Sequence, residues 1–105
     1  MDDDSNSYKY LSDSVAAKKA KAARVYYFEV EGRGIRIGCT WEPKVRISTH
    51  ERTWPNGRLL AMEHGYRALE GKRHRQFAEE RIFERQEWFR PSEKLLEHIG
   101  GLGCD

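Results

Sequence analysis

The chain lacks the features that mark several classes of protein. It has only two cysteines, Cys39 and Cys104, which form neither a CxxC motif nor a disulfide framework. No apolar run approaches the roughly 18 residues of a membrane span, and none follows the acidic start as a signal peptide requires. The net charge of +2 excludes a histone-like protein that binds nucleic acid through bulk charge. With 105 residues, we expect one small, cytoplasmic domain without membrane contact.

Charge is distributed unevenly along the first quarter of the chain. Residues 1–14 contain four aspartates and one lysine, whereas residues 15–24 contain four basic side chains and no acidic one. We therefore predict that residues 1–23 form a disordered acidic tail followed by a basic, Ala/Lys-rich arm of high helix propensity. The arm is either a phosphate-contacting segment or a solvated linker. At the other end, the glycine-rich residues 100–105 are expected to form a flexible tail.

Residues 24–99 have the pattern of a small α+β domain. Aromatic residues make up 11% of the chain, enough to build a core despite its high content of charged residues. In chain order, the predicted elements are strands at 25–31 and 35–39, a helix capped by Thr40 and ending near 51, a strand at 58–63, and helices at 66–81 and 91–99. This order predicts a three-stranded antiparallel sheet flanked by helices. Trp88 is expected in the core, whereas the loop residue Trp54 suits either a core or a base-stacking role.

One carboxylate falls on an apolar helix face. At 100° per residue, Glu70 lies within the stripe formed by Tyr66, Leu69 and Phe77. A carboxylate there costs free energy unless a cation or a metal accompanies it. The pattern leaves two interpretations open, a boundary ion pair with a neighbouring basic residue or a metal ligand. His74, on the edge of the same face, is read as a satisfied boundary residue rather than a ligand.

A second pair of polar residues lies on the short helix after the hairpin. Arg46 and His50 are four residues apart and therefore share one face. Arginine offers a planar fork of donors for phosphate oxygens, and histidine can donate to or move a proton at the same group. The same spacing is common on solvated helix faces, so the spacing alone does not choose between the two interpretations.

The order of these candidates resembles the GIY-YIG endonuclease domain. Arg24-Val-Tyr26 stands in place of Gly-Ile-Tyr and Arg36-Ile-Gly38 in place of Tyr-Ile-Gly, and Arg46 follows eight residues after the glycine. Downstream, residues 68–77 read Ala-Leu-Glu-x3-His-x2-Phe, and Glu87-Trp-Phe89 follows. These features resemble a small stand-alone branch of the superfamily that often has Lys-Ile-Gly in its second motif and Gly-Glu-Trp-Phe near its end. The resemblance covers roughly residues 24–99.

The resemblance implies hydrolysis of DNA phosphodiester bonds with one bound divalent metal, Mg²⁺ or Mn²⁺. Glu70 would hold the metal, and Arg46 would stabilise charge on the phosphate oxygens. Tyr26 would act as general base, with Arg36 supplying the positive charge that lowers the pKa of its phenol. His50 completes the expected catalytic set. Because an arginine occupies the second tyrosine's position, a mechanism that uses both tyrosines is excluded.

The hairpin register decides whether Tyr26 and Arg36 can cooperate. A loop at 32–34 places Tyr26 opposite Thr40, so that Tyr26 and Arg36 share a face of the sheet. A slip of one residue would separate them. Tyr27, the rival candidate for the base, points to the opposite face.

The expected partner is DNA. Phosphate contacts are predicted for Arg46, for Lys44 and for the arm residues Lys18, Lys19 and Lys21. No accessory DNA-binding domain fits into a chain of this length, so target choice would come from the catalytic face, a homodimer or an accessory protein. The alternative function is a module of the same fold that binds nucleic acid but cuts it weakly or not at all.

Overall fold

The computed structural model describes residues 13–83 and 85–102. The predicted acidic tail lies almost wholly outside these residues, as do the last three residues of the predicted C-terminal tail. The elements in chain order are α2 (Asp13–Ala22), β1 (Arg24–Val30), β2 (Gly34–Thr40), α3 (Pro43–Thr53), β3 (Gly57–His64), α4 (Arg67–Gln76), the 3₁₀ turn η1 (Ala78–Glu80), β4 (Arg81–Ile82), β5 (Arg85–Phe89) and α5 (Glu93–Gly100). The predicted α+β class is confirmed.

The sheet is antiparallel and has five strands in the order β3-β1-β2-β5-β4. The prediction of three strands is wrong because β4 and β5 were missed. β4 has only two residues, too few to show any alternation of polar and apolar side chains. The helix predicted at 66–81 ends earlier, at Gln76, because Phe77 leaves the helical conformation and its side chain is fully buried.

The register of the β1–β2 hairpin differs by two residues from the prediction. Tyr26 lies opposite Gly38, and Phe28 lies opposite Arg36. The loop begins at Glu31 because Gly34, which has a positive φ of 116°, already pairs with the end of β1. A shift of two residues preserves the faces of the strands. Tyr26 and Arg36 therefore share a face, as predicted.

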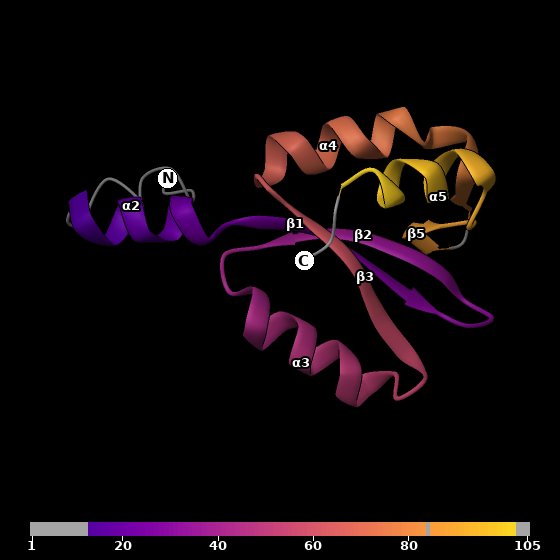
Figure 1. The fold of residues 1–105 in the computed structure, drawn as a ribbon, viewed down its shortest axis with the longest axis horizontal. Helices are drawn as coiled ribbons and strands as arrows, with labels where there is room; N and C mark the ends of the chain where they lie inside the picture. Colours follow the sequence, from indigo (N-terminus) through magenta and orange to yellow (C-terminus); the bar gives the residue numbers. More distant parts are fainter. Residues whose placement is uncertain (1–12, 84, 103–105) are drawn as a thin grey trace.

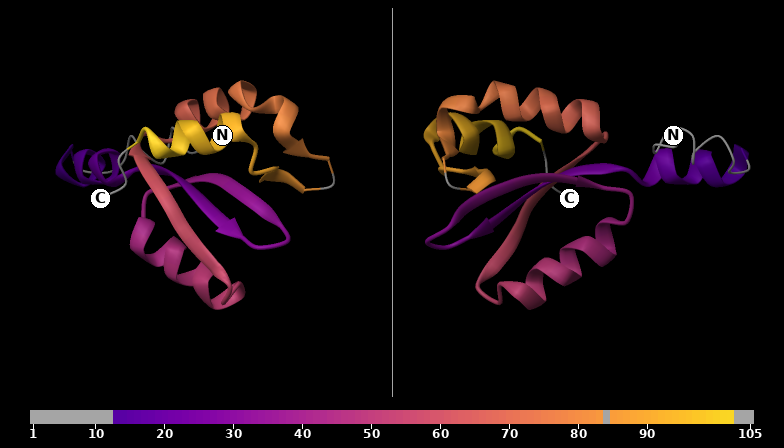
Figure 2. Two further views of the ribbon diagram at one scale, coloured as in Figure 1. Left: turned by 45° about the vertical axis from the view of Figure 1, so that its right-hand side comes forward. Right: turned by 180° about the vertical axis from the view of Figure 1, so that it is seen from behind.

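Helices cover both faces of the sheet (Figures 1 and 2): α4 and α5 lie on one face and α3 lies on the other. The core under α4 and α5 comprises Val25, Tyr27, Ile35, Ile37, Ala61, Phe77, Phe89, Leu95 and Ile99. The core on the α3 side comprises Tyr26, Phe28, Val30, Ile47 and Trp88. Trp88 is only 4% exposed, which confirms its predicted place in the core. Adjacent aromatic residues of β1 thus serve opposite cores.

The basic arm forms α2, which extends away from the sheet (Figure 1). A single residue, the buried Ala23, joins it to β1, and the Ala23 carbonyl accepts a hydrogen bond from the Gly65 amide. At the other end of the domain, α5 continues to Gly100 and Leu102 packs against the core, beyond the predicted boundary at residue 99. No helix within the described ranges is long and apolar enough to cross a bilayer.

Candidate active site

The second half of β2 forms an open edge of the sheet. β5 pairs only with the first half of β2, where Ile35 lies opposite Phe89 and Arg36 opposite Trp88. The next carbonyl, that of Ile37, accepts a hydrogen bond from Nε2 of His74 on α4 at 2.8 Å. His74 therefore has a hydrogen-bond partner within the fold. The candidate active site lies around this edge, between α3 and α4.

On the α3 side of β2, Tyr26 and His50 form a buried pair. The Tyr26 hydroxyl lies 2.9 Å from Nε2 of His50, and the two residues are 1% and 7% exposed. Burial, together with the nearby guanidinium groups of Arg36 and Arg46, lowers the pKa of His50 to about 4, against a smaller opposing effect of Glu87. His50 is thus neutral at pH 7. Its Nε2 can accept the phenolic proton of Tyr26.

Gly38 makes room for the Tyr26 ring. A Cβ atom at this position would lie 2.5 Å from the Tyr26 hydroxyl oxygen and 2.7 Å from Cζ. Because the ring is packed within the core on the α3 side, moving it would disturb the side chains packed around it. The glycine of the second motif is therefore required here by the tyrosine of the first.

Arg36 is ion-paired rather than available to Tyr26. Its Nη2 atom lies 2.5 Å from Oε1 of Glu87, and its guanidinium group lies 5.8 Å from the centre of the Trp88 ring. The expected role of Arg36 as the cation that assists the phenol stays a prediction, and the Glu87 carboxylate partly compensates its charge. Glu87 was not among the predicted site residues. The only sequence signal for it is its place in the Glu-Trp-Phe motif.

Glu70 approaches β2 from the other face. It is half-buried on α4, and its carboxylate lies close enough to the thiol of Cys39 to disfavour the thiolate. Burial, together with the negative charge of Glu70, raises the pKa of Cys39 to about 12. Of the basic residues on α4 that could form a boundary ion pair with Glu70, Arg73 is paired with Glu63 and His74 with a carbonyl, so Arg67, three residues before Glu70, is the neighbour left for that interpretation. Glu70 and Tyr26 therefore lie on opposite faces of β2 and approach each other only around its open edge.

The fit of a divalent metal to Glu70 can be judged from its surroundings. Within the described residues, no group of three or more histidine, cysteine, aspartate or glutamate side chains is arranged to hold a metal. Mg²⁺ is commonly held by one or two carboxylates, with water and phosphate oxygens as its other ligands. The Glu70 carboxylate, which lies beside a thiol that stays neutral, fits such a site. A site built entirely from protein ligands does not fit.

A hollow of about 360 Å³ opens beside these groups. It is lined by Lys19, Cys39, Thr40, Trp41, Glu42, Arg46 and Tyr66. Arg46 is exposed on α3, so its guanidinium is accessible to a phosphate. The hollow thus joins the Arg46 side of β2 to the Cys39–Glu70 side.

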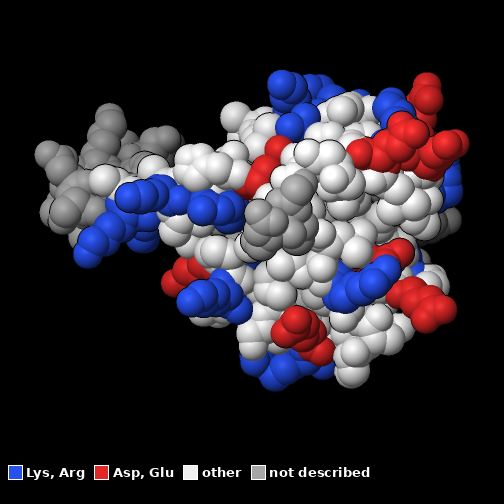
Figure 3. Space-filling view, viewed as in Figure 1, with Lys and Arg blue, Asp and Glu red and all other residues white. Residues whose placement is uncertain are grey.

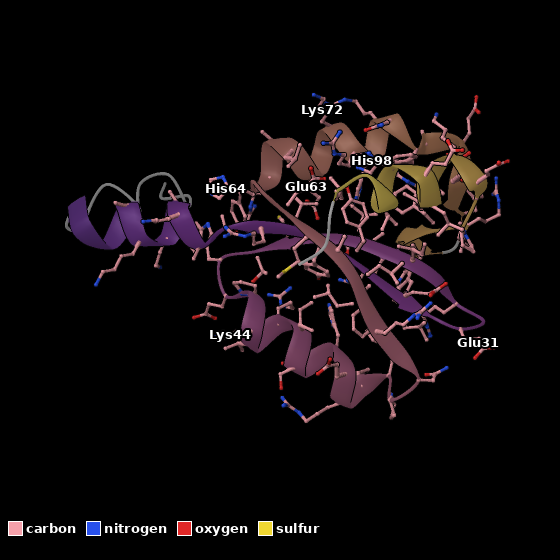
Figure 4. All side chains as sticks on the ribbon, viewed as in Figure 1. Glu31, Lys44, Glu63, His64, Lys72 and His98 are labelled. Carbon is pink, nitrogen blue, oxygen red and sulfur yellow. The ribbon has the colours of Figure 1, made fainter. Side chains whose placement is uncertain are left out.

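Most of the lysines predicted to contact phosphate do not line this hollow. Lys44 is exposed near the start of α3 (Figure 4), and Lys18 and Lys21 are exposed on α2. Lysine side chains line α2 along the face that Figure 3 shows. Among the predicted lysines, Lys19 alone lines the hollow itself.

A polar network on the opposite face of β1 involves Tyr27. Its hydroxyl donates to Oε2 of Glu63 at 2.5 Å and lies 3.0 Å from Nε2 of His98 (Figure 4 labels Glu63 and His98). Arg73 donates to both carboxylate oxygens of Glu63 at 2.9 Å. Burial and the neighbouring carboxylate raise the pKa of Tyr27 far above its usual value, so Tyr27 stays protonated and is a poor candidate for the base. Sequence reasoning missed this network, whose members come from four separate elements.

No known protein family, curated protein or solved structure matches this chain. The relationship to GIY-YIG nucleases stays a prediction that depends on the motifs themselves.

Proposed function

We propose that this protein is a metal-dependent endonuclease that hydrolyses DNA phosphodiester bonds at the open edge of β2. The observation that carries the proposal is the buried Tyr26–His50 pair next to the exposed Arg46. A neutral imidazole that accepts from a phenol is a proton-transfer pair, and a nearby guanidinium suits a phosphate. The GIY-YIG-like order of these residues supports the same reaction.

Each residue has a distinct task in this proposal. Arg46 binds non-bridging phosphate oxygens and stabilises the charge that develops on them. Tyr26 accepts a proton from the attacking water while its own proton passes along the 2.9 Å hydrogen bond to Nε2 of His50. Glu70 would hold Mg²⁺ or Mn²⁺, which supplies Lewis-acid stabilisation of the phosphate and the leaving oxygen. Arg36 acts indirectly, because its charge helps to keep His50 neutral.

One observation favours the alternative, a module that binds nucleic acid without cutting it. Tyr26 is 1% exposed, whereas Arg46 and Lys44 are both exposed. The groups that would contact phosphate are therefore accessible, and the proposed base is covered. DNA binding needs only the exposed groups that contact phosphate. Hydrolysis also needs water to reach the Tyr26 phenol at the sheet edge.

Cleavage by matched variants tests the proposal. Supercoiled plasmid and branched DNA are incubated with Mg²⁺ or Mn²⁺ and the wild-type chain, Glu70→Gln or Arg46→Gln. We expect nicking by the wild type and a loss of about 10²–10³-fold in either variant, as for removal of one group that stabilises the transition state. Glu79→Gln and Arg52→Gln are the controls, since both residues are exposed and lie away from the hollow.

The result also separates the two functions. Binding without cleavage in either metal would favour the binding module. Equal losses in the controls and in the site variants would contradict the site assignment.

A further inference from the structure

Two aromatic rings and two cations form a continuous stack at the hollow. The rings of Trp41 and Tyr66 are stacked, with centres 5.0 Å apart and an angle of 25° between their planes. Nζ of Lys19 lies 4.6 Å from the centre of the Trp41 ring, and the Arg67 guanidinium lies 5.4 Å from that of Tyr66. These four residues come from α2, from the loop before α3 and from the start of α4. The stack therefore assembles only in the folded chain.

The stack lies next to a phosphate-binding group. Trp41, Tyr66 and Lys19 line the same hollow as Arg46, and both rings are half-buried. The hollow's volume of about 360 Å³ is at the small end of the range for small-molecule sites, about 300–1,000 Å³. Flat aromatic surface beside lysine and arginine complements a nucleotide, which has a flat base and a charged phosphate.

Base pairing decides which nucleotides can use this surface. In a duplex, both faces of each base are covered by stacked neighbours, so a protein ring cannot reach them without unstacking the helix. An unpaired base has a free face. A stacked base contributes roughly 5- to 150-fold to affinity, whereas an exposed cation–π contact contributes about two- to fivefold. A base can therefore displace the Lys19 ammonium from Trp41.

We propose that this hollow binds an unpaired nucleotide, with its base on the Trp41 ring and its phosphate between Lys19 and Arg46. This inference rests on the proposed nuclease function and names its substrate class: single-stranded, gapped or branched DNA rather than intact duplex. Lys19 moves from the ring to the phosphate when the base arrives. Binding thus brings the C-terminal turn of α2, which carries Lys19, into contact with the substrate.

Binding without metal tests the inference separately from cleavage. The full chain is titrated in EDTA with fluorescent (dT) oligomers of about 12 nucleotides and with a duplex of the same length. We expect Trp41→Ala to weaken binding of the single strand at least fivefold and binding of the duplex less than twofold. Trp41→Phe, which keeps an aromatic face, should retain most of the affinity even if Trp41→Ala perturbs folding.

Tryptophan fluorescence gives a second readout. Stacking of thymine on Trp41 should quench the emission of the wild type and of the control Trp54→Phe, but not that of Trp41→Phe. The inference would be overturned if Trp41→Ala lost affinity equally for the single strand and the duplex, or lost affinity for neither. Tighter binding of an oligomer of uridine ribonucleotides than of (dT) would overturn the assignment to DNA.

Failure of this inference differs from failure of the nuclease proposal. If the wild type cuts DNA but Trp41→Ala binds single strands normally, the unpaired-nucleotide site is wrong and the nuclease stands. If single-strand binding depends on Trp41 but neither metal supports cutting, the nuclease is wrong and the binding site stands.

Discussion

The hydroxyl of Tyr26 and Nε2 of His50 are 2.9 Å apart, in a place where both side chains are almost fully buried. The pair joins β1 to α3 across 24 residues of sequence. Each polar atom in it satisfies the other, so removal of either partner leaves a buried polar group without that partner. Stability and proton transfer therefore depend on the same hydrogen bond.

Tyr26→Phe distinguishes the structural role of this hydrogen bond from its role in proton transfer, because we expect a smaller effect on stability than on cleavage. The loss of the hydroxyl leaves Nε2 of His50 without its phenol partner, which should lower the free energy of unfolding by about 1–3 kcal/mol in urea titrations. Cleavage should fall by more, about 10²–10⁴-fold, because a proton-transfer group is removed. Tyr27→Phe is the matched control, since its hydroxyl serves Glu63 and His98 on the opposite face. An equal fall in cleavage in this control would contradict the role given to Tyr26.

Stability should fall with pH as His50 becomes protonated. In the unfolded chain His50 titrates near its usual pKa of about 6.5, whereas in the folded protein its pKa is about 4. Between these values the unfolded state binds more protons, so the free energy of unfolding decreases as the pH falls from about 6.5 towards 4. The contribution of His50 is on the order of 3 kcal/mol over this window.

Urea titrations at several pH values compare the wild type with His50→Gln. The variant should lose most of the slope that His50 contributes and keep the part due to His98, whose pKa is also lowered by burial. An unchanged slope in His50→Gln would show that the imidazole is not buried in its neutral form.

Gly38→Ala should damage the site through Tyr26. The new Cβ would lie 2.5 Å from the hydroxyl oxygen of Tyr26, so the ring or the strand has to shift. We expect a decrease of about 1–3 kcal/mol in stability, as for other overpacked cores, together with loss of cleavage. In the double variant with Tyr26→Leu, the cost of Gly38→Ala should shrink, since the ring that it meets is gone. Equal costs in both backgrounds, measured in a double-mutant cycle, would refute this steric conflict.

The lysines of α2 should act through salt-dependent binding. Replacing the exposed Lys18 and Lys21 by glutamine should weaken oligonucleotide binding and reduce the slope of log K against log salt by about 1 for each lysine that neutralises a phosphate. Circular dichroism should show an unchanged fold, since neither side chain is buried. An unchanged slope would identify α2 as a solvated linker, the other interpretation of its sequence.

Local sequence patterns predicted which side chains share a face of the hairpin, but not its register or all the strands of the sheet. Alternation of side chains placed Tyr26 and Arg36 on one face and Tyr27 on the other, and these faces survived a two-residue error in register. The position of the loop caused that error, because Gly34 pairs with Val30 and the three-residue loop therefore begins one residue earlier than predicted. The two-residue strand β4 was missed because pairing with β5, and not its own sequence, makes it a strand.

The candidate site was predictable residue by residue but not as an arrangement. Helical periodicity identified Glu70 as a carboxylate on a buried face, and the structure places it against Cys39. Sequence spacing did not reveal that Glu70 and Tyr26 flank opposite faces of β2. The pairing of Arg36 with Glu87 was also hidden, because it depends on β5 lying beside β2. Contacts between distant segments leave no periodic trace in either one.

The short link between α2 and β1 affects the length of nucleic acid that the protein can cover. The helix has ten residues, so it extends about 15 Å from Ala23, the buried residue that joins it to the sheet. DNA rises about 3.4 Å per base pair along its axis. A nucleic acid that follows α2 away from the hollow would therefore be covered for about four additional base pairs, on one side of the cut only, and nuclease protection by the bound protein should be correspondingly asymmetric.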